Sequence, residues 1–218
     1  GPSHRHALCQ WGYETIEAYN GVSRSTAVAA IAYFDRFLSS NTPAAERALN
    51  DVVQCQLAFV TSLVIALKIH AGFKKVESDF VSGVITRNAY GADEINSMEL
   101  EILRSLSWKL NGPTPHDFID YFLEVMPGVN GTCLEHIRSL SKTLVELAVT
   151  RYDTVMHLPS EIAFASIFCA TYHLELQLLA DSLRFLQMIS GVEVREDNFR
   201  YLIQTMICFV RERYASLE

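Results

Sequence analysis

The 218-residue sequence lacks an excess of positive charge, because 18 lysines and arginines stand against 25 aspartates and glutamates, for a formal net charge of −7. Proteins whose main task is to neutralise nucleic-acid phosphates usually present a basic surface. The charge balance therefore argues against nucleic acid as the main partner.

Cysteine is scarce, and its pattern does not suggest pairing. The cysteines are odd in number, far apart and mostly set in apolar segments; they are Cys9, Cys55, Cys133, Cys169 and Cys208. This distribution is typical of buried free thiols and not of a disulfide framework. We therefore expect a protein of a reducing, intracellular compartment.

The short motifs of catalysis and cofactor binding are also missing. The sequence holds no glycine-rich phosphate loop and no Gly-x-Ser-x-Gly nucleophile elbow. Its seven histidines, among them His4, His6 and His70, form no compact set with cysteine or acid at metal-ligand spacing. Glu99 and Glu101 point to different faces of a predicted helix, so they do not make a carboxylate pair. We expect a protein that is not an enzyme and that binds no metal or cofactor.

Period-two alternation bounded by turn residues does not occur, so no strand pattern competes with helices. The longest uncharged stretch is the sixteen residues between Asp51 and Lys68, within a predicted central helix, Asn50–His70. Sixteen residues fall short of the roughly 20 that span a bilayer, and a helix that is apolar on every face is normally buried. We expect no membrane span, and we expect other helices to surround this one.

The spacing of apolar residues predicts the helices around the central one. In the first half, the pattern predicts a first helix, Arg5–Tyr19, and a second helix that Ser23 or Ser25 caps and that ends at Ser40. After the central helix it predicts a short helix, Ser78–Thr86, and a longer one, Asp93–Ser107. Asn41-Thr42-Pro43 is interpreted as the stop of the second of these helices.

The strongest break in the chain is Asn111-Gly112-Pro113-Thr114-Pro115, because two prolines and a glycine cannot continue a helix. The second half then repeats the plan of the first, with predicted helices Pro115–Glu124, Thr132–Arg151, Pro159–Leu174, Ala180–Ile189 and Arg195–Tyr214. Its third helix is charge-free between Glu161 and Glu175. The prediction is an all-α protein with two tandem five-helix domains, 4–110 and 115–218, joined by a linker at 111–114.

Three charges lie on helix faces that are otherwise apolar. Asp35 lies on the apolar stripe of the second helix, where a carboxylate is costly unless paired, and Arg5 is the candidate cation. We expect these two residues to form a buried structural ion pair. Lys68 ends the central helix, and Glu99 lies within the apolar arc of Asp93–Ser107. A local salt bridge between Lys68 and Glu99 would explain both.

Residues Tyr33-Phe34-Asp35-Arg36-Phe37-Leu38-Ser39-Ser40 resemble the signature of a cyclin box. Other pieces follow in register and are similar to the same family; they are Arg5 and Trp11, Gln56-Leu57, Ala66-Leu67-Lys68, Glu99, Trp108-Lys109-Leu110, Pro113-Thr114, and His157-Leu158-Pro159-Ser160. The resemblance to cyclins covers essentially the whole chain. It implies two cyclin-box domains in tandem, each around one central apolar helix.

The resemblance implies a function as the regulatory subunit of a cyclin-dependent kinase in cell-cycle control, located in the nucleus, the cytoplasm or both. The cyclin residues that Lys68 and Glu99 resemble face the kinase and hold the helix that carries its catalytic glutamate. The apolar neighbours that match the family's interface are Ile69, Leu103, Trp108 and Leu110. A kinase interface and a local salt bridge are compatible in the free subunit.

Cyclins of the cell-cycle type often recruit substrate or inhibitor peptides through an apolar patch on the first helix. The residues that match or stand in this patch are Ala7, Leu8, Trp11, Glu14 and Gln56. Small or polar residues at His4, Ala7 and Cys55 replace larger apolar ones, so we expect weak docking of Arg-x-Leu peptides. Lys68 is followed by Ile69-His70-Ala71 and not by an aromatic residue and paired acids, which implies an altered choice of kinase.

Two alternatives use the same tandem fold. The core of a general transcription factor would bind promoter DNA, but it should carry an excess of basic residues. A pocket-type peptide-binding protein fits the charge, but it need not keep both Lys68 and Glu99.

Overall fold

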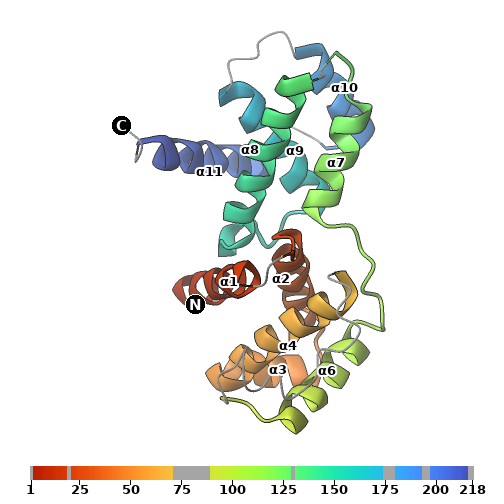
Figure 1. The fold of residues 1–218 in the computed structure, drawn as a ribbon, viewed down its shortest axis with the longest axis vertical. Helices are drawn as coiled ribbons and strands as arrows, with labels where there is room; N and C mark the ends of the chain where they lie inside the picture. The colour runs from red at the N-terminus through yellow and green to blue at the C-terminus, as the bar shows by residue number, and fades with distance from the viewer. Residues whose placement is uncertain are drawn as a thin grey trace. The chain divides into compact units, whose positions relative to one another are not determined.

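The computed structural model describes residues 2–18, 21–70, 89–128, 131–173, 180–192 and 197–215. Within these ranges the regular elements are helices and no strand is formed, so the predicted all-α class is confirmed. The chain divides into two compact units, Gly1–Gly112 and Pro113–Glu218, whose helices are labelled in Figure 1. The division falls inside the segment 111–114 in which the sequence predicts a linker.

Unit 1 contains α1 (Pro2–Glu17), α2 (Ser25–Leu38), α3 (Pro43–Asn50), α4 (Val52–His70) and α6 (Ala92–Ser105). Helices α1, α2 and α6 begin and end within three residues of the predicted bounds. The predicted helix Ser78–Thr86 lies outside the described residues.

Helix α3 was not predicted, and its presence moves the start of the central helix from Asn50 to Val52. Thr42 caps α3, because its Oγ1 accepts a hydrogen bond from the Ala45 N–H at 3.3 Å, and a proline follows at the first helical position. The same Asn-Thr-Pro triplet that ends α2 therefore also starts α3. Asp51 then has extended backbone dihedrals, and its Oδ1 accepts from the Val53 N–H at 2.8 Å to begin α4.

Helix α4 is the centre of unit 1. Its residues from Leu57 to Leu67 are all buried, and it contacts α1, α2, α3 and α6. The Phe59 ring makes T-shaped contacts with the rings of Trp11 and Phe34 at centroid distances of 6.2 and 5.2 Å. A Cβ at Gly12 would lie only 3.1 Å from the Phe59 ring, so glycine permits the close approach of α1 to α4.

By length and composition, α4 is the one helix among the described residues that could cross a membrane, although 61% of its most apolar window is buried inside the protein. This burial accounts for the apolar sequence of α4, since a core helix has the same composition.

Unit 2 repeats the plan, as predicted. Its elements are α7 (Pro115–Val125), α8 (Gly131–Val149), the short 3₁₀ helix η2 (Tyr152–Thr154), α9 (Pro159–His173), α10 (Ala180–Ser190) and α11 (Asp197–Ala215). Thr114 caps α7 in a reciprocal box, in which its backbone N–H donates to Asp117 Oδ2 at 2.7 Å. Helix α9 contacts α7, α8, α10 and α11, which makes it the counterpart of α4.

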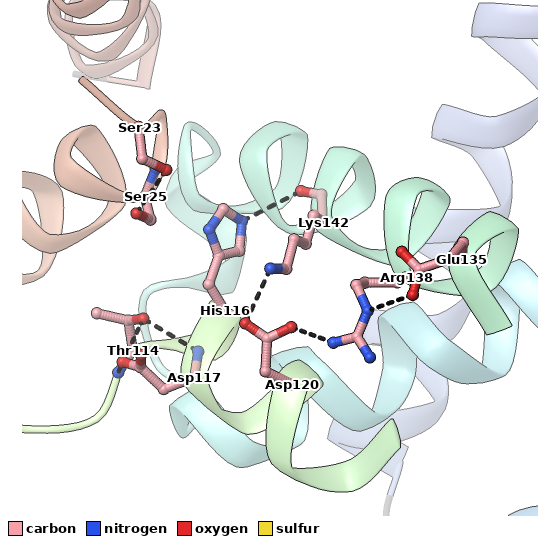
Figure 2. Close-up of polar contacts among 9 residues, drawn as sticks. All are labelled: Ser23, Ser25, Thr114, His116, Asp117, Asp120, Glu135, Arg138 and Lys142. Carbon is pink, nitrogen blue, oxygen red and sulfur yellow. Dashed lines mark hydrogen bonds and ion pairs between the residues drawn. The ribbon is translucent and has the colours of Figure 1, made fainter. Parts of the chain in front are cut away.

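Polar residues join α7 to α8, as Figure 2 shows. Lys142 Nζ donates to Asp120 at 2.8 Å, Arg138 pairs with the other carboxylate oxygen, and Glu135 lies 3.5 Å from Arg138. Burial acts to raise the pKa of Asp120, but the hydrogen bonds from Lys142 and Arg138 outweigh it and lower the pKa. His116 is 5% exposed, and its Nε2 lies 3.4 Å from the Lys142 carbonyl. Burial lowers the pKa of His116.

Candidate functional site

Lys68 and Glu99 form an ion pair that bridges α4 and α6. Lys68 Nζ donates to both carboxylate oxygens of Glu99, at 2.7 and 2.6 Å. The Lys68 side chain is 35% exposed and that of Glu99 is 17% exposed. The local salt bridge is therefore formed in the free chain, and it lies at the surface of unit 1, where another protein can reach the lysine.

The predicted apolar neighbours lie at the ends of the same two helices. Ile69 follows Lys68 and is 40% exposed, whereas Leu103 in the last turn of α6 is half-buried. Trp108 comes shortly after α6 and is 64% exposed, and Leu110 is half-buried. We call these six residues the candidate site; they are Lys68, Ile69, Glu99, Leu103, Trp108 and Leu110.

The segment Ser107–Leu110, here called the exit segment, leaves α6 with an unusual backbone. Ser107 and Trp108 have φ angles of +52° and +59°. This left-handed region is uncommon for residues other than glycine, and least common for bulky ones. The turn is closed by a hydrogen bond of 2.9 Å from the Trp108 N–H to the Leu103 carbonyl. The result is a large indole that projects into solvent directly after α6.

Two residues that the sequence did not assign to the site, Tyr33 and Arg36, hold the exit segment, and His70 contacts one of them. The Tyr33 hydroxyl donates to the Leu110 carbonyl at 3.0 Å and lies 2.7 Å from Nε2 of His70. Arg36 Nη2 donates to the Lys109 carbonyl at 2.7 Å. Tyr33 and Arg36 are one turn apart on α2, and His70 is the last residue of α4, so three helices meet around this segment.

Arg5 and Asp35, expected as a structural pair, are in contact between α1 and α2. Arg5 Nη2 donates to Asp35 Oδ2 at 2.8 Å, and Nη1 pairs with Oδ1. Their side chains are 9% and 22% exposed. Burial raises the pKa of the Asp35 carboxyl, and the hydrogen bonds from Arg5 oppose that shift. The geometry is that of a mostly buried two-point salt bridge.

The residues of the expected peptide-docking patch lie on α1 and at the start of α4. Ala7 and Glu14 are exposed, whereas Leu8, Trp11 and Gln56 are half-buried. Polar groups in this patch already have partners inside the chain. Glu14 accepts a hydrogen bond from Gln10 at 3.1 Å, and Gln56 lies 3.4 Å from the Tyr90 hydroxyl.

A second ion pair on α6 offers a comparison with Lys68 and Glu99. Arg47 of α3 donates to Glu101 at 2.7 Å, and the side chains are 53% and 37% exposed. In the part of the chain that the structure describes, no three His, Cys, Asp or Glu side chains converge as metal ligands.

Comparison with protein families gives two matches that together cover nearly the whole chain. Residues 1–111 match the cyclin N-terminal domain, and residues 113–217 match the cyclin C-terminal domain. Among individual proteins, cyclin-A1-1 of Arabidopsis thaliana is 30% identical over 173 residues, which are 79% of this chain and 35% of that protein. G1/S-specific cyclin-D1 of Xenopus laevis is 31% identical over 175 residues, which are 80% of this chain and 56% of that protein. The chain spans between a third and somewhat over half of the length of these relatives.

Solved structures share the fold at low sequence identity. A viral cyclin from herpesvirus saimiri superposes with a TM-score of 0.70 at 14% identity, over 94% of this chain and 85% of that one. A chain of the CAK complex from Chaetomium thermophilum bound to ATP-gamma-S superposes with a TM-score of 0.59 at 15% identity, over 96% of this chain and 61% of that one. At these identities the likeness concerns the fold alone.

Proposed function

This chain belongs to the cyclin family, and from that premise we propose that it is the regulatory subunit of a cyclin-dependent serine/threonine kinase and acts in cell-cycle control. In this proposal the candidate site binds the kinase and positions the helix that carries the catalytic glutamate. The chain contributes no catalytic group of its own, and it works in the nucleus, the cytoplasm or both.

The physical logic is that of population shift. A kinase of this class needs a helix glutamate to pair with the lysine that binds the ATP phosphates. A partner that binds the paired state more tightly than the unpaired state shifts the kinase toward the active form. A partner surface must be rigid to discriminate between the two states. The Lys68–Glu99 bridge supplies rigidity, because it joins α4 and α6 before the kinase arrives and so reduces the ordering needed on binding.

The observation that carries the proposal is the exposure of Trp108 directly after α6. An indole that is 64% exposed contributes little to the core of unit 1. Tryptophan is enriched at the centres of protein interfaces, and it is among the residues whose removal weakens binding most. The Lys68–Glu99 pair, which joins the end of α4 to the middle of α6, adds charges that orient a partner.

The test is activation of a purified cyclin-dependent kinase by the purified chain, measured as phosphorylation of a substrate peptide. Wild type should bind and activate at least one such kinase. Trp108→Ala should bind that kinase at least about 30-fold more weakly, as expected for an aromatic hot spot. Tyr152→Ala is the matched control, because the Tyr152 side chain is 63% exposed and lies in unit 2.

Two results would contradict the proposal. The first is that wild type activates no cyclin-dependent kinase and instead retains promoter DNA or a peptide, as the transcription-factor and pocket-type alternatives require. The second is that Trp108→Ala and Tyr152→Ala weaken kinase binding equally.

A further inference from the structure

The exit segment combines a strained backbone with an exposed side chain. Ser107 and Trp108 both hold positive φ angles, and the indole that this conformation projects is mostly in solvent. Backbone in such sparsely populated regions persists only where the surroundings over-determine it, and it clusters at functional sites. The contacts that hold the exit segment are therefore as informative as the indole itself.

Tyr33 supplies one of these contacts from inside unit 1. The Tyr33 side chain is buried, with 3% of the residue exposed, and its hydroxyl donates to the Leu110 carbonyl at 3.0 Å. The same phenol oxygen lies 2.7 Å from Nε2 of His70 and accepts from it in the tautomer that carries the proton on Nε2. Hydrogen bonds from His70 through Tyr33 to the Leu110 carbonyl thus tie the end of α4 to the exit segment.

Arg36 supplies a second contact, to the neighbouring carbonyl. Its Nη2 donates to the Lys109 carbonyl at 2.7 Å, in a charge-assisted hydrogen bond. Arg36 and Tyr33 lie three residues apart on α2, and residues at this spacing share one face of a helix. One face of α2 therefore fixes two successive peptide groups immediately after Trp108.

We propose that Tyr33 and Arg36 are positioning residues that hold the exit segment so that Trp108 is presented to the kinase. The inference rests on the proposed function, and it adds two residues that touch the backbone of the site and not its side chains. When either bond is removed, the free chain populates other conformations of the exit segment, because positive φ angles at Ser107 and Trp108 are no longer enforced. Apparent affinity then falls in proportion to the fraction of chains that remain competent to bind.

The test uses Tyr33→Phe, Arg36→Gln and Trp108→Ala, each alone, and the two positioning variants combined with Trp108→Ala. Kinase association and dissociation rates are measured by surface plasmon resonance, with a cyclin-dependent kinase that wild type binds. Tyr90→Phe is the matched control, since Tyr90 is also buried and its hydroxyl bonds to the Val53 carbonyl at 3.3 Å, in the first turn of α4.

Each positioning variant should bind about 3- to 10-fold more weakly, which corresponds to one hydrogen bond. The loss should fall on the association rate, because fewer free chains are competent, whereas the loss in Trp108→Ala should fall on the dissociation rate. In the Trp108→Ala background the two variants should add little further loss, since they act through the indole. The Tyr90→Phe control should bind as wild type does.

These outcomes separate the inference from the proposed function. If Trp108→Ala binds normally, the proposed interface is wrong. If Trp108→Ala binds weakly but Tyr33→Phe and Arg36→Gln bind as tightly as wild type, the interface stands and the positioning role is refuted. Full additivity with Trp108→Ala would also refute the positioning role.

A second readout needs no kinase. The sequence has two tryptophans, so Trp108 becomes the sole tryptophan in a Trp11→Phe background and can be excited at a wavelength that tyrosine does not absorb. In that background, Tyr33→Phe and Arg36→Gln should each increase the fast, local component of fluorescence anisotropy decay at Trp108, while Tyr90→Phe should not. Unchanged decay in both variants would overturn the inference, whichever partner the chain has.

Discussion

Removal of either member of the Arg5–Asp35 pair should destabilise unit 1 by roughly 3 to 5 kcal/mol, the usual penalty for leaving one buried charge without its partner. The side chains are 9% and 22% exposed, so neither charge is well hydrated after the loss. For Arg5→Ala the charge penalty has an upper limit, because the stranded carboxyl of Asp35 can take up a proton. Protonating an aspartate at pH 7 costs about 4 kcal/mol relative to its ordinary pKa.

Because of this protonation, the stability of the Arg5→Ala variant should depend on pH differently from that of wild type. Burial raises the pKa of Asp35, so without Arg5 the folded state binds a proton more readily than the unfolded state does. The difference in the free energy of unfolding between wild type and the variant should therefore shrink as pH falls below 7, by up to about 1.4 kcal/mol per pH unit.

The assay is a double-mutant cycle in urea. Both tryptophans, Trp11 and Trp108, lie in unit 1, so tryptophan fluorescence follows the unfolding of the unit that contains the pair. Linear extrapolation then yields free energies for Arg5→Ala, Asp35→Ala and the double variant. The loss of unfolding free energy in the double variant should be smaller than the sum of the losses in the two single variants, by about 2 kcal/mol or more. Simple additivity, or a deficit that does not change with pH, would refute the reasoning.

Three shorter predictions concern the rest of the chain. Because burial lowers the pKa of His116, the unfolded state binds the proton more readily, and stability should fall as pH drops below about 6.5. Urea midpoints measured by circular dichroism should decline less with falling pH in His116→Gln than in wild type, and an equal decline would contradict the assignment. Burial raises the pKa of the Cys9 and Cys169 thiols to about 12, so a maleimide at about pH 8 should label the exposed Cys208 before either of them. The order of labelling can be read by mass spectrometry, and modification of Cys9 before Cys208 would contradict the fold. Arg-x-Leu peptides should bind near Trp11 weakly or not at all, and low-micromolar binding by calorimetry would show that the apolar patch is sufficient.

Most of the fold could be predicted because the signals are local. A charge-free stretch of sixteen residues predicts the buried helix α4, and the same signal recurs in α9. The missed helix α3 shows where local signals conflict. Thr42-Pro43 is both a stop for α2 and a cap followed by a first helical residue, and the sequence pattern predicts only the stop.

The candidate site could be predicted in part. Lys68 and Glu99 were identified because charge on an apolar helix face is out of pattern, and a residue's charge is visible in the sequence. The roles of Tyr33 and Arg36 could not be predicted, because an aromatic residue on an apolar stripe gives no sign that its hydroxyl reaches a carbonyl 77 residues away. The positive φ angle of Trp108 is likewise imposed by tertiary contacts and not by any local preference.

The central claim is that Lys68 and Glu99 serve a kinase and not only the fold. The most direct measurement places urea unfolding of Lys68→Ala and Glu99→Ala beside their affinity for the kinase. The controls are Arg47→Ala and Glu101→Ala, which break the other ion pair on α6. Glu99→Ala should change stability by under about 1 kcal/mol, since the Lys68 that it leaves without a partner is 35% exposed and can be hydrated. Lys68→Ala should destabilise unit 1 more than Glu99→Ala does, because the carboxylate that it leaves is only 17% exposed. Kinase affinity should fall by about 2 to 5 kcal/mol, or roughly 30- to 5,000-fold, and the controls should bind normally. Loss of the fold with kinase activation intact per folded molecule would contradict the claim, and it would leave the pair as a local salt bridge.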